Sequence, residues 1–237
     1  QTHNTMLPHR RNGLIGAMDE EIALLRRQMD VEQETAAAGI VFYRGRLADK
    51  PVILCKSGVG KVNAAMCAQI MIDRFQPEAV VFTGVAGALD PSLDIADVVV
   101  SSECMQHDMD ASALGFPKGT IPFQDVSVFP ADPRLVDAAF SAAEAAGVKA
   151  VIGRVLSGDQ FIASRDTVRL LHEEMGGTCT EMEGAAVAQV CFMNRVPYVV
   201  IRSISDRADG SAHMDFAEFT DTASRQSSRI VETMLRK

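Results

Sequence analysis

The sequence predicts an α/β protein, a three-layer α/β/α sandwich around a mixed, mostly parallel central sheet. Short apolar runs, such as 79–83 and 197–201, alternate with longer segments in which apolar residues recur at helical spacing. The apolar runs are continuous, which is typical of strands covered on both faces, as in a parallel sheet. Strands and helices that alternate along a chain favour such a sheet with helices packed on it.

The length and composition indicate one soluble domain. A chain of 237 residues can bury a full core, and we assign residues 13–237 to one domain behind a tail, residues 1–12. The tail has no periodicity, and we interpret it as disordered or as an appended segment. No apolar run approaches the roughly 20 residues that span a bilayer, and no signal-peptide core is seen, so we expect a cytoplasmic protein.

Charge and ligand spacing exclude several classes of function. A net charge of −8 argues against a nucleic-acid or membrane partner, since both require basic patches. The five cysteines form no C-x-x-C pair, and the five histidines show no ligand spacing. We therefore expect no metal and no cofactor.

The first third of the chain predicts strands at 14–18, 40–47 and 51–56, with a helix opened by Asp19, Glu20 and Glu21 after the first. A glycine-rich turn at 57–61 leads into a helix that reaches Phe75. It lacks the G-x-x-x-x-G-K-[ST] spacing of a phosphate loop, so we interpret it as a tight strand-to-helix turn.

The middle of the chain continues the alternation. The strand at 79–83 ends in a glycine-rich turn, 84–88, where a ligand could approach the backbone closely. The segment 111–130 is rich in proline and glycine and predicts a long loop, and such loops are usually functional or at an interface. The other elements predicted here are a strand at 95–101, a helix at 133–147, a strand at 151–156 and a helix from 164 to 176.

The segment 178–209 carries most of the candidate chemistry. A helix over about 181–193 leads into the buried strand 197–201, which ends in a polar group that includes Arg202 and Asp206. Because ligands of open α/β sheets bind beyond the carboxyl ends of strands, we expect the site here. Glu181 and Glu183 at the helix start could equally be simple complements to the helix dipole. A last helix follows over 215–235.

Seven separated blocks stand in a characteristic order: IGAMDEEI (15–22), SGVGKVNAA (57–65), TGVAGAL (83–89), QHDMDASALG (106–115), SGDQFI (157–162), EMEGAA (181–186) and RSISDRAD (202–209). With them the chain resembles the nucleoside phosphorylase/hydrolase superfamily, and within it the 5′-methylthioadenosine/S-adenosylhomocysteine nucleosidases. The resemblance implies hydrolysis of 5′-substituted adenosines, including 5′-deoxyadenosine, to adenine and a 5-substituted ribose. It also implies a part in methionine salvage and nucleoside catabolism.

The same resemblance assigns catalytic roles. Asp206 would be the general acid that protonates adenine N7, and Glu21 the general base that takes a proton from water. Arg202 and Ser205 would position the water and the aspartate. This agrees with the chemistry, because the departing purine needs an acid that stays protonated at neutral pH, while the base must be ionised. A nearby carboxylate would stabilise the oxocarbenium-like ribose.

The resemblance also implies a substrate pocket completed by a second subunit. Glu183 would accept hydrogen bonds from the ribose hydroxyls, Phe161 and Ile162 would flank the adenine, and Leu114 and Pro122 would reach the neighbouring pocket of a homodimer. The substrate-binding residues implied within one chain are Met18, Val59, Val85, Ala86, Gly87, Phe161, Ile162, Glu181, Met182, Glu183 and Phe216.

Three alternatives stay open at this point. Val85 stands where some members carry serine, and this resembles relatives that hydrolyse 6-amino-6-deoxyfutalosine. A purine nucleoside phosphorylase of this fold would need arginines around a phosphate, and the candidate turns offer little beyond Lys61. A nucleoside-binding module without turnover would use the acidic clusters only as helix caps.

Overall fold

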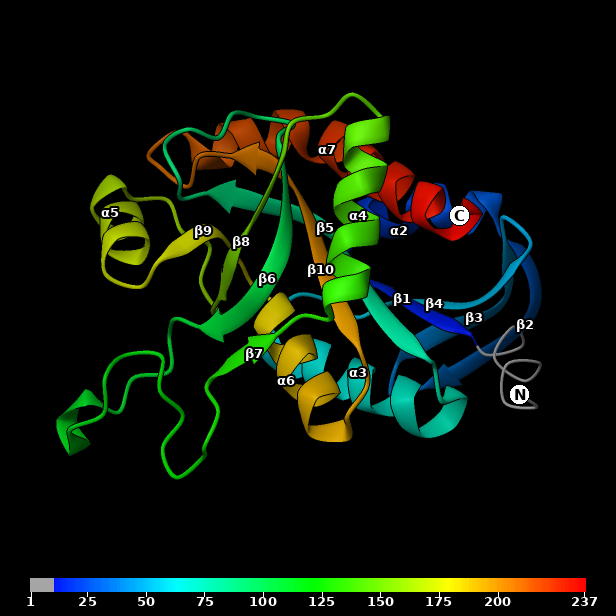
Figure 1. Ribbon diagram of the computed structural model, residues 1–237, viewed down its shortest axis with the longest axis horizontal. Coiled ribbons are helices and arrows are strands. Elements are labelled where there is room, and N and C mark those ends of the chain that lie inside the picture. The colour runs from blue at the N-terminus through cyan, green and yellow to red at the C-terminus, as the bar shows by residue number, and fades with distance from the viewer. Residues whose placement is uncertain (1–10) are drawn as a thin grey trace.

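The computed structural model describes residues 11–237, and they form a mixed α/β fold around one ten-stranded sheet (Figure 1). The predicted fold class is confirmed. The strands are β1 (Asn12–Gly16), β2 (Asp30–Ala37), β3 (Ile40–Leu47), β4 (Lys50–Lys56), β5 (Ala79–Ala88), β6 (Val98–Gln106), β7 (Val128–Pro130), β8 (Ala150–Ser157), β9 (Gly177–Glu181) and β10 (Tyr198–Asp206). The helices are α2 (Asp19–Gln28), α3 (Lys61–Phe75), α4 (Pro133–Ala145), α5 (Arg165–Glu173), α6 (Gly184–Asn194) and α7 (Ala212–Arg236), with a short 3₁₀ turn, η2, at Ser112–Leu114.

The sheet has the order β10-β6-β8-β9-β5-β1-β4-β3-β2, and β7 pairs with β6. Parallel pairing runs through β4, β1, β5 and β10 and again through β6, β8 and β9. Antiparallel pairs join these two sets, β10 to β6 and β5 to β9. Because β10 pairs with both β5 and β6, this half of the sheet closes on itself and brings the ends of β5, β9 and β10 together.

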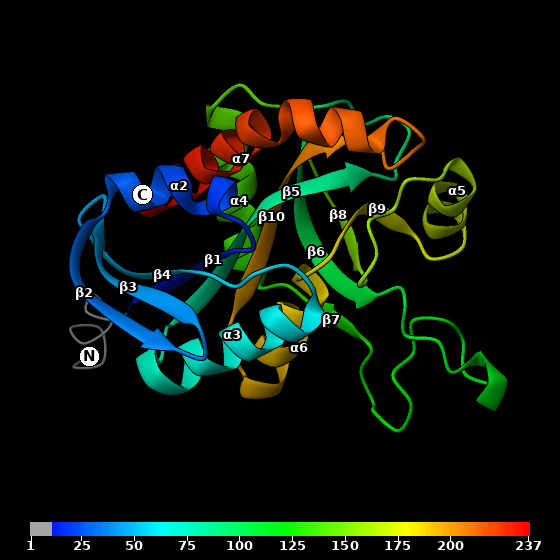
Figure 2. The ribbon, with the colours of Figure 1, turned by 180° about the vertical axis from the view of Figure 1, so that it is seen from behind.

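Helices cover both faces of the sheet. Figures 1 and 2 show α2, α4 and α7 on one side and α3 and α6 on the other, with α5 beyond the end of β9. The two central strands, β5 and β10, are buried at every position. Their apolar runs predict this for the first half of each strand, and both strands continue beyond the predicted ends at residues 83 and 201. These buried strands form a rigid base for the polar residues at their carboxyl ends.

Three strands were not predicted from the sequence. The shortest, β7, ends the segment 111–130 that was expected to be a loop, and it pairs antiparallel with β6. The other two are β2 and β9. β2 carries DVEQETAA, which is too polar to stand out as a strand, but it pairs antiparallel with β3 at the sheet edge. β9 was not predicted because it begins within the double glycine that ends the preceding predicted helix. Both add antiparallel pairs, so the sheet is more evenly mixed than predicted. β9 also moves the start of α6 to Gly184, so that Glu181 ends a strand and does not open the helix.

Smaller boundary differences have local causes. β1 begins at Asn12, two residues before the predicted strand, and Arg11 donates to the carbonyl of Gly45. Residues 1–10 of the predicted tail lie outside the described residues. β6 runs from Val98 to Gln106, later than the predicted strand at 95–101, because the residues before Val98 form a turn in which Asp97 N–H donates to Asp94 carbonyl.

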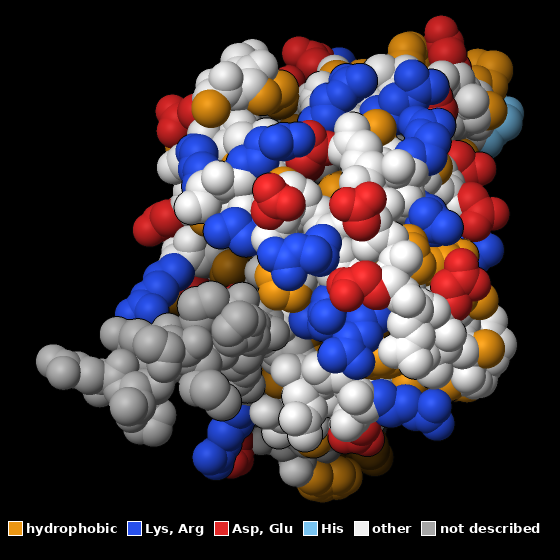
Figure 3. All heavy atoms as spheres, turned by 90° about the vertical axis from the view of Figure 1, so that its right-hand side faces the viewer, with side chains coloured by type: hydrophobic (Ala, Val, Ile, Leu, Met, Phe, Trp, Pro, Cys, Tyr) orange, Lys and Arg blue, Asp and Glu red, His pale blue; other side chains and the backbone are white. Residues whose placement is uncertain are grey.

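The surface differs between the two ends of the molecule. On the face beside the β2–β3 edge, basic and acidic side chains are interspersed (Figure 3), and charges on an edge strand oppose edge-to-edge pairing. At the other end, the segment 107–127 projects away from the body (Figures 1 and 2). Phe123 and Leu114 on this segment are 92% and 71% exposed. Within residues 11–237, no helix is both long and apolar enough to span a membrane.

Candidate active site

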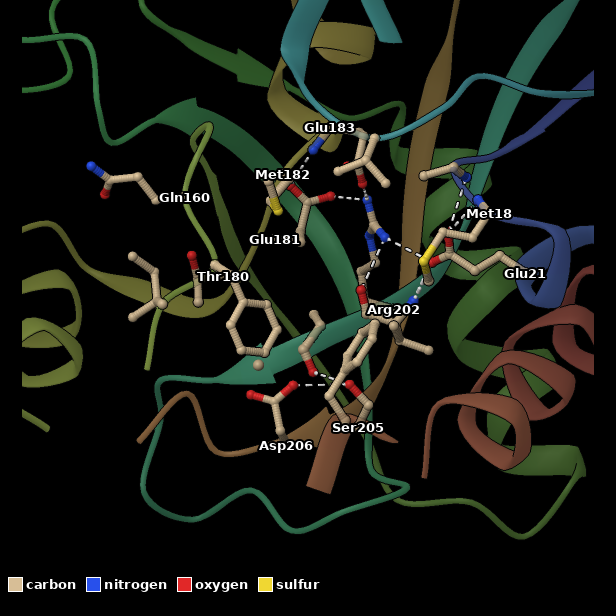
Figure 4. Close-up of a pocket in the computed structure, with 18 residues that line it drawn as sticks. Met18, Glu21, Gln160, Thr180, Glu181, Met182, Glu183, Arg202, Ser205 and Asp206 are labelled. Carbon is tan, nitrogen blue, oxygen red and sulfur yellow. Dashed lines mark hydrogen bonds and ion pairs between the residues drawn. The ribbon is translucent and has the colours of Figure 1, made fainter. Parts of the chain in front are cut away.

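A cavity of about 300 Å³ lies at the carboxyl ends of β5, β9 and β10, a size that suits a small ligand. Figure 4 shows two polar groups at its opposite ends, one around Arg202 and one at Asp206. The cavity is lined by Ala17, Met18, Glu21, Val59, Val85, Ala86, Gly87, Gln160, Phe161, Ile162, Thr180, Glu181, Met182, Glu183, Arg202, Ser205, Asp206 and Phe216. All four residues predicted to be catalytic therefore share one cavity.

Glu21 lies at the start of α2, beyond the end of β1, and is buried. Its Oε1 accepts from the backbone N–H groups of Ala17 and Met18, both at 3.0 Å, and its Oε2 accepts from Val85 N at 2.8 Å. The local sequence explains this, because a glutamate at the third helix position reaches back to the free amides before the helix. The carboxylate is thus held by two elements, α2 and β5.

Arg202 on β10 joins three buried carboxylates. It pairs with Glu21 at 3.4 Å and Glu183 at 3.3 Å, and also contacts Glu181. Its guanidinium donates to the carbonyl of Val85 at 3.0 Å and lies 4.4 Å from the ring centroid of Phe82. Three carboxylates surround one guanidinium, so the cluster carries excess negative charge.

The two outer glutamates of this cluster have different tasks. Glu181 accepts from Gly184 N at 2.8 Å and from Ser157, so its carboxylate caps the N-terminus of α6. Glu183 accepts from Gly60 N at 3.0 Å, and its carboxylate lines the cavity. Burial raises the pKa of Glu183 to about 7. Arg202 lowers this pKa, whereas the neighbouring carboxylates of Glu181 and Glu21 raise it further.

At the other end of the cavity, Asp206 ends β10 and is 3% exposed. Its Oδ1 accepts from Ala208 N at 2.8 Å, and its Oδ2 accepts from the Ser205 hydroxyl at 3.0 Å. Burial raises the pKa of Asp206, and these two hydrogen bonds act in the opposite direction. A carboxyl group with a raised pKa is suited to donate a proton.

Burial raises the pKa of Glu21 as well, against the effects of Arg202 and of three backbone amides. The sequence analysis expected an ionised base opposite a protonated acid, and the difference between the two groups lies in their partners. Glu21 receives three N–H groups and a guanidinium, which hold the ionised form, whereas Asp206 receives one N–H and one hydroxyl. A base whose pKa is raised toward neutrality is also a stronger base.

The register of the sheet sets the spacing of the two acids. Glu21 approaches β5 at Gly84, where an added Cβ would lie 2.6 Å from Arg202 Nη1 and closer still to Glu21. Asp206 approaches the same strand at Gly87, where an added Cβ would lie 2.9 Å from Asp206 Oδ1. Three residues of strand span about 10 Å. A ligand can therefore lie along β5 with one acid at each end.

Aromatic and apolar side chains form the walls. Phe161 and Phe216 meet edge to face with ring centroids 5.5 Å apart, and one comes from the loop after β8 while the other comes from α7. Met18, Val59, Val85 and Ile162 also line the cavity, as predicted. Leu114 and Pro122 do not, because both lie on the projecting segment 107–127.

Three lining residues were not predicted from the sequence: Ala17, Gln160 and Thr180. Ala17 and Gln160 lie inside quoted blocks, so their position next to Met18 and Phe161 was the available signal. Thr180 lies on β9, which was not predicted. Its hydroxyl is buried and has no hydrogen-bond partner among the described residues.

Among residues 11–237, no three His, Cys, Asp or Glu side chains gather in a way that could hold a metal ion. Carboxylates already occupy two backbone amides at the end of the glycine-rich turn. Gly60 N donates to Glu183, and Lys61 N donates to Asp159 at 2.8 Å. The Lys61 ammonium is bound to Asp108 at 2.7 Å.

Comparisons with known proteins show the family of the chain. Residues 11–236 match the family model of the phosphorylase superfamily. The chain is similar to a 5′-methylthioadenosine/S-adenosylhomocysteine nucleosidase of Staphylococcus haemolyticus, at 40% identity over 94% of this chain and 98% of the relative.

Solved structures are similar over nearly the whole chain. One is the 5′-methylthioadenosine/S-adenosylhomocysteine nucleosidase of Neisseria meningitidis in complex with methylthio-immucillin-A, with a TM-score of 0.92, 36% identity, and coverage of 96% of this chain and 99% of that one. Another is a futalosine hydrolase of Helicobacter pylori, with a TM-score of 0.91, 35% identity, and coverage of 96% and 97%.

Proposed function

The chain belongs to the phosphorylase superfamily, and on that premise we propose that it hydrolyses the N-glycosidic bond of 5′-substituted adenosines, releasing adenine and a 5-substituted ribose. The chain is a hydrolase of N-glycosyl compounds, and 5′-methylthioadenosine, S-adenosylhomocysteine and 5′-deoxyadenosine are the substrates proposed. The observation that carries the proposal is the single cavity with Asp206 at one end and Glu21 with Arg202 at the other.

We assign the departing purine to the Asp206 end. The carboxyl group donates its proton to adenine N7, so that the base leaves as a neutral molecule. The raised pKa of Asp206 supports this role, because burial shifts the carboxyl group toward its protonated form. The Ser205 hydroxyl, 3.0 Å from Asp206 Oδ2, orients the carboxyl group. Phe161 and Ile162 flank the purine ring.

We assign the attacking water to the Glu21 end. Glu21 takes a proton from the water, and Arg202 holds the carboxylate in place. As the glycosidic bond breaks, positive charge develops on the ribose, and the net negative cluster of three glutamates and one arginine stabilises it. Glu183 accepts from the ribose hydroxyls. Glu181 acts indirectly, because its oxygens already bind Arg202 and the start of α6.

Hydrolysis is favoured over phosphorolysis because the basic side chains and the backbone N–H groups near the sugar end are already bound to carboxylates. A phosphate dianion needs free cations and N–H groups beside the sugar. Lys61 is bound to Asp108, Gly60 N is bound to Glu183, and Arg202 is surrounded by carboxylates. Phosphate would meet excess negative charge at this end of the cavity.

The experiment that tests the proposal compares adenine release from 5′-methylthioadenosine in phosphate-free buffer and in buffer with added phosphate. We expect equal rates, with adenine and 5-methylthioribose as products. A strict requirement for phosphate would establish a phosphorylase. Tight binding of the nucleoside without adenine release would instead establish a binding module.

A second substrate, 6-amino-6-deoxyfutalosine, is supported by the likeness to the futalosine hydrolase of Helicobacter pylori. Val85, which stands where some family members carry serine, lines the cavity, and its backbone N–H donates to Glu21. Parallel kcat/KM values for the four nucleosides decide the physiological substrate. A value for 6-amino-6-deoxyfutalosine below one hundredth of the best would remove it from the list.

We also propose a homodimer in which Leu114 and Pro122 of one subunit complete the pocket of the other. Its support is the exposed apolar surface of the segment 107–127. A cytoplasmic setting is supported by the five free cysteines, all buried. Methionine salvage is the role that we propose for methylthioadenosine hydrolysis.

A further inference from the structure

Three loops meet above the cavity, and three of their residues form a closed ring of hydrogen bonds. Asp108, after β6, accepts from the Lys61 ammonium at 2.7 Å and from Asp159 N at 2.9 Å. Asp159, after β8, accepts from Lys61 N at 2.8 Å. Each of the three residues therefore binds the other two, and we call Lys61, Asp108 and Asp159 the loop clasp.

The loop clasp also supplies a carboxylate cap for the start of α3. This helix has glycine at its N-cap and no acidic residue in its first turn. Asp159 from another loop caps Lys61 N, and Glu183 accepts from Gly60 N at 3.0 Å. The positive end of the helix dipole thus meets two carboxylates, and one of them belongs to the cavity.

Close packing of the loops depends on Gly158. A Cβ at this position would lie 2.6 Å from His107 Nε2 and 3.0 Å from Asp108 Cγ. The glycine therefore lets the loop after β8 approach the loop after β6 closely enough for Asp159 N to reach Asp108. The Lys61 ammonium has a further acceptor, Gln106 Oε1 at 2.9 Å.

Two of the three segments that the clasp joins carry a part of the cavity, and the segment after β6 ties them together through Asp108. Val59 precedes Gly60 in the turn before α3, while Phe161 and Ile162 follow Asp159. None of the three clasp residues lines the cavity itself. Val59 and Phe161 are 46% and 47% exposed, so neither is fixed by burial in the core.

We propose that Lys61, Asp108 and Asp159 are positioning residues, which hold the Val59 turn and the Phe161–Ile162 loop in register with Glu183 for substrate binding. The inference rests on the proposed nucleosidase activity. The clasp acts mainly on affinity, because it fixes walls that contact the nucleoside before and after bond cleavage, whereas Glu21 and Asp206 are held by other elements.

The test compares Lys61→Met with Lys149→Met, which removes another lysine from an ion pair, to Asp97 at 3.4 Å, away from the cavity. We expect Lys61→Met to raise KM for 5′-methylthioadenosine about tenfold, with kcat changed less than threefold. Lys149→Met should match the wild type. Lys61→Arg should recover most of the loss, because a guanidinium can also bind Asp108.

A KM within twofold of the wild type for Lys61→Met would overturn the proposal, and so would a loss confined to kcat. Asp108→Asn serves where Lys61→Met does not fold, with the same expected rise in KM.

Amide hydrogen exchange provides a readout without activity. Segments 57–62 and 157–163 should exchange faster in Lys61→Met and stay unchanged in Lys149→Met. Unchanged exchange would also overturn the clasp. If the wild type released no adenine, the proposed function would fail, while faster exchange would still show that the clasp holds the loops.

Discussion

At the scale of single residues, the site depends on how three buried glutamates share one arginine. Burial lowers the pKa of Arg202, but the glutamates more than offset this, and the pKa is raised. The guanidinium therefore stays charged, while the cluster keeps excess negative charge. Removal of one partner from such a buried group leaves an uncompensated charge.

Glu21→Gln tests the proposed base. The amide cannot accept a proton from water, so we expect kcat to fall about 10²- to 10⁴-fold. Glu20→Gln is the matched control, because Glu20 is the exposed neighbour on the same turn of α2, and its kcat should stay within twofold. Steady-state adenine release measures both. A Glu21→Gln enzyme as active as Glu20→Gln would show that the base lies elsewhere.

Asp206→Asn tests the raised pKa of the proposed acid through stability. A folded-state pKa above the unfolded value gives full stability only below the unfolded pKa, about 3.9, and stability is lost as pH rises through the folded pKa. Asparagine stays neutral throughout. Asp206→Asn should therefore melt above the wild type at pH 7, with the gain vanishing near pH 4.

Thermal unfolding between pH 4 and 8 measures this difference. Asp137→Asn, at an exposed position on α4, is the control and should show no such gain. A lower Tm for Asp206→Asn than for the wild type at pH 7 would contradict the assignment.

At the scale of elements, β5 brings the two ends of the site together. Its glycines leave room for Glu21 and Asp206 to lie directly on the strand, which no larger residue would allow at Gly84. The sequence predicted the strand over 79–83, because a continuous apolar run is a strong signal, but the turn expected at 84–88 is wrong, since these residues continue β5 to Ala88. The sequence could not show which side chains fill the space beside each glycine, since that depends on β10 and α2.

Gly84→Ala tests this close approach. The added methyl group would overlap the Glu21 carboxylate, so we expect kcat/KM to fall at least about 100-fold. Overpacking should also cost about 1–3 kcal/mol of stability. Gly210→Ala is the control, because a Cβ there meets nothing within 4 Å. Equal activity of the two variants would show that Glu21 and Arg202 move aside without loss.

The same scale explains what sequence reasoning missed. β9 has five residues, and its alternation is too short to separate it from the glycines before it. Because β9 was not predicted, Glu181 was assigned to the start of a helix, and Thr180 was not recognised as a lining residue. The polar residues at the carboxyl end of β10 were easier to predict, because they follow a continuous apolar run; the structure places Arg202 to Asp206 within the strand itself. Contacts between distant segments, such as Glu183 with Gly60, required the fold.

At the scale of the whole molecule, the two ends of the protein differ in the side chains that they expose. Charged side chains cover the β2–β3 edge, whereas the segment 107–127 carries Leu114 and Phe123 into solvent. These two exposed side chains are the observation that supports the proposed interface. The composition gave no sign of this, because the asymmetry lies in placement and not in residue counts.

Leu114→Glu tests the proposed dimer. A buried charge at the subunit interface should release monomers, and the loss of Leu114 from the neighbouring pocket should raise KM. Val41→Glu, at a half-exposed position on β3 at the far edge, is the control and should remain dimeric. Sedimentation at micromolar concentration measures the mass. A monomeric wild type, or a Leu114→Glu variant that stays dimeric, would contradict the proposal.

The central claim is that one cavity delivers a proton to the purine from Asp206 while Glu21 prepares the water. Single-turnover adenine release from 5′-methylthioadenosine by Asp206→Asn, with nucleoside binding measured on the same sample, tests it most directly. We predict that the variant binds the nucleoside with a Kd near that of the wild type and releases adenine at least about 10²-fold more slowly. Release at the wild-type rate would contradict the account, because the leaving purine would then take its proton from another group.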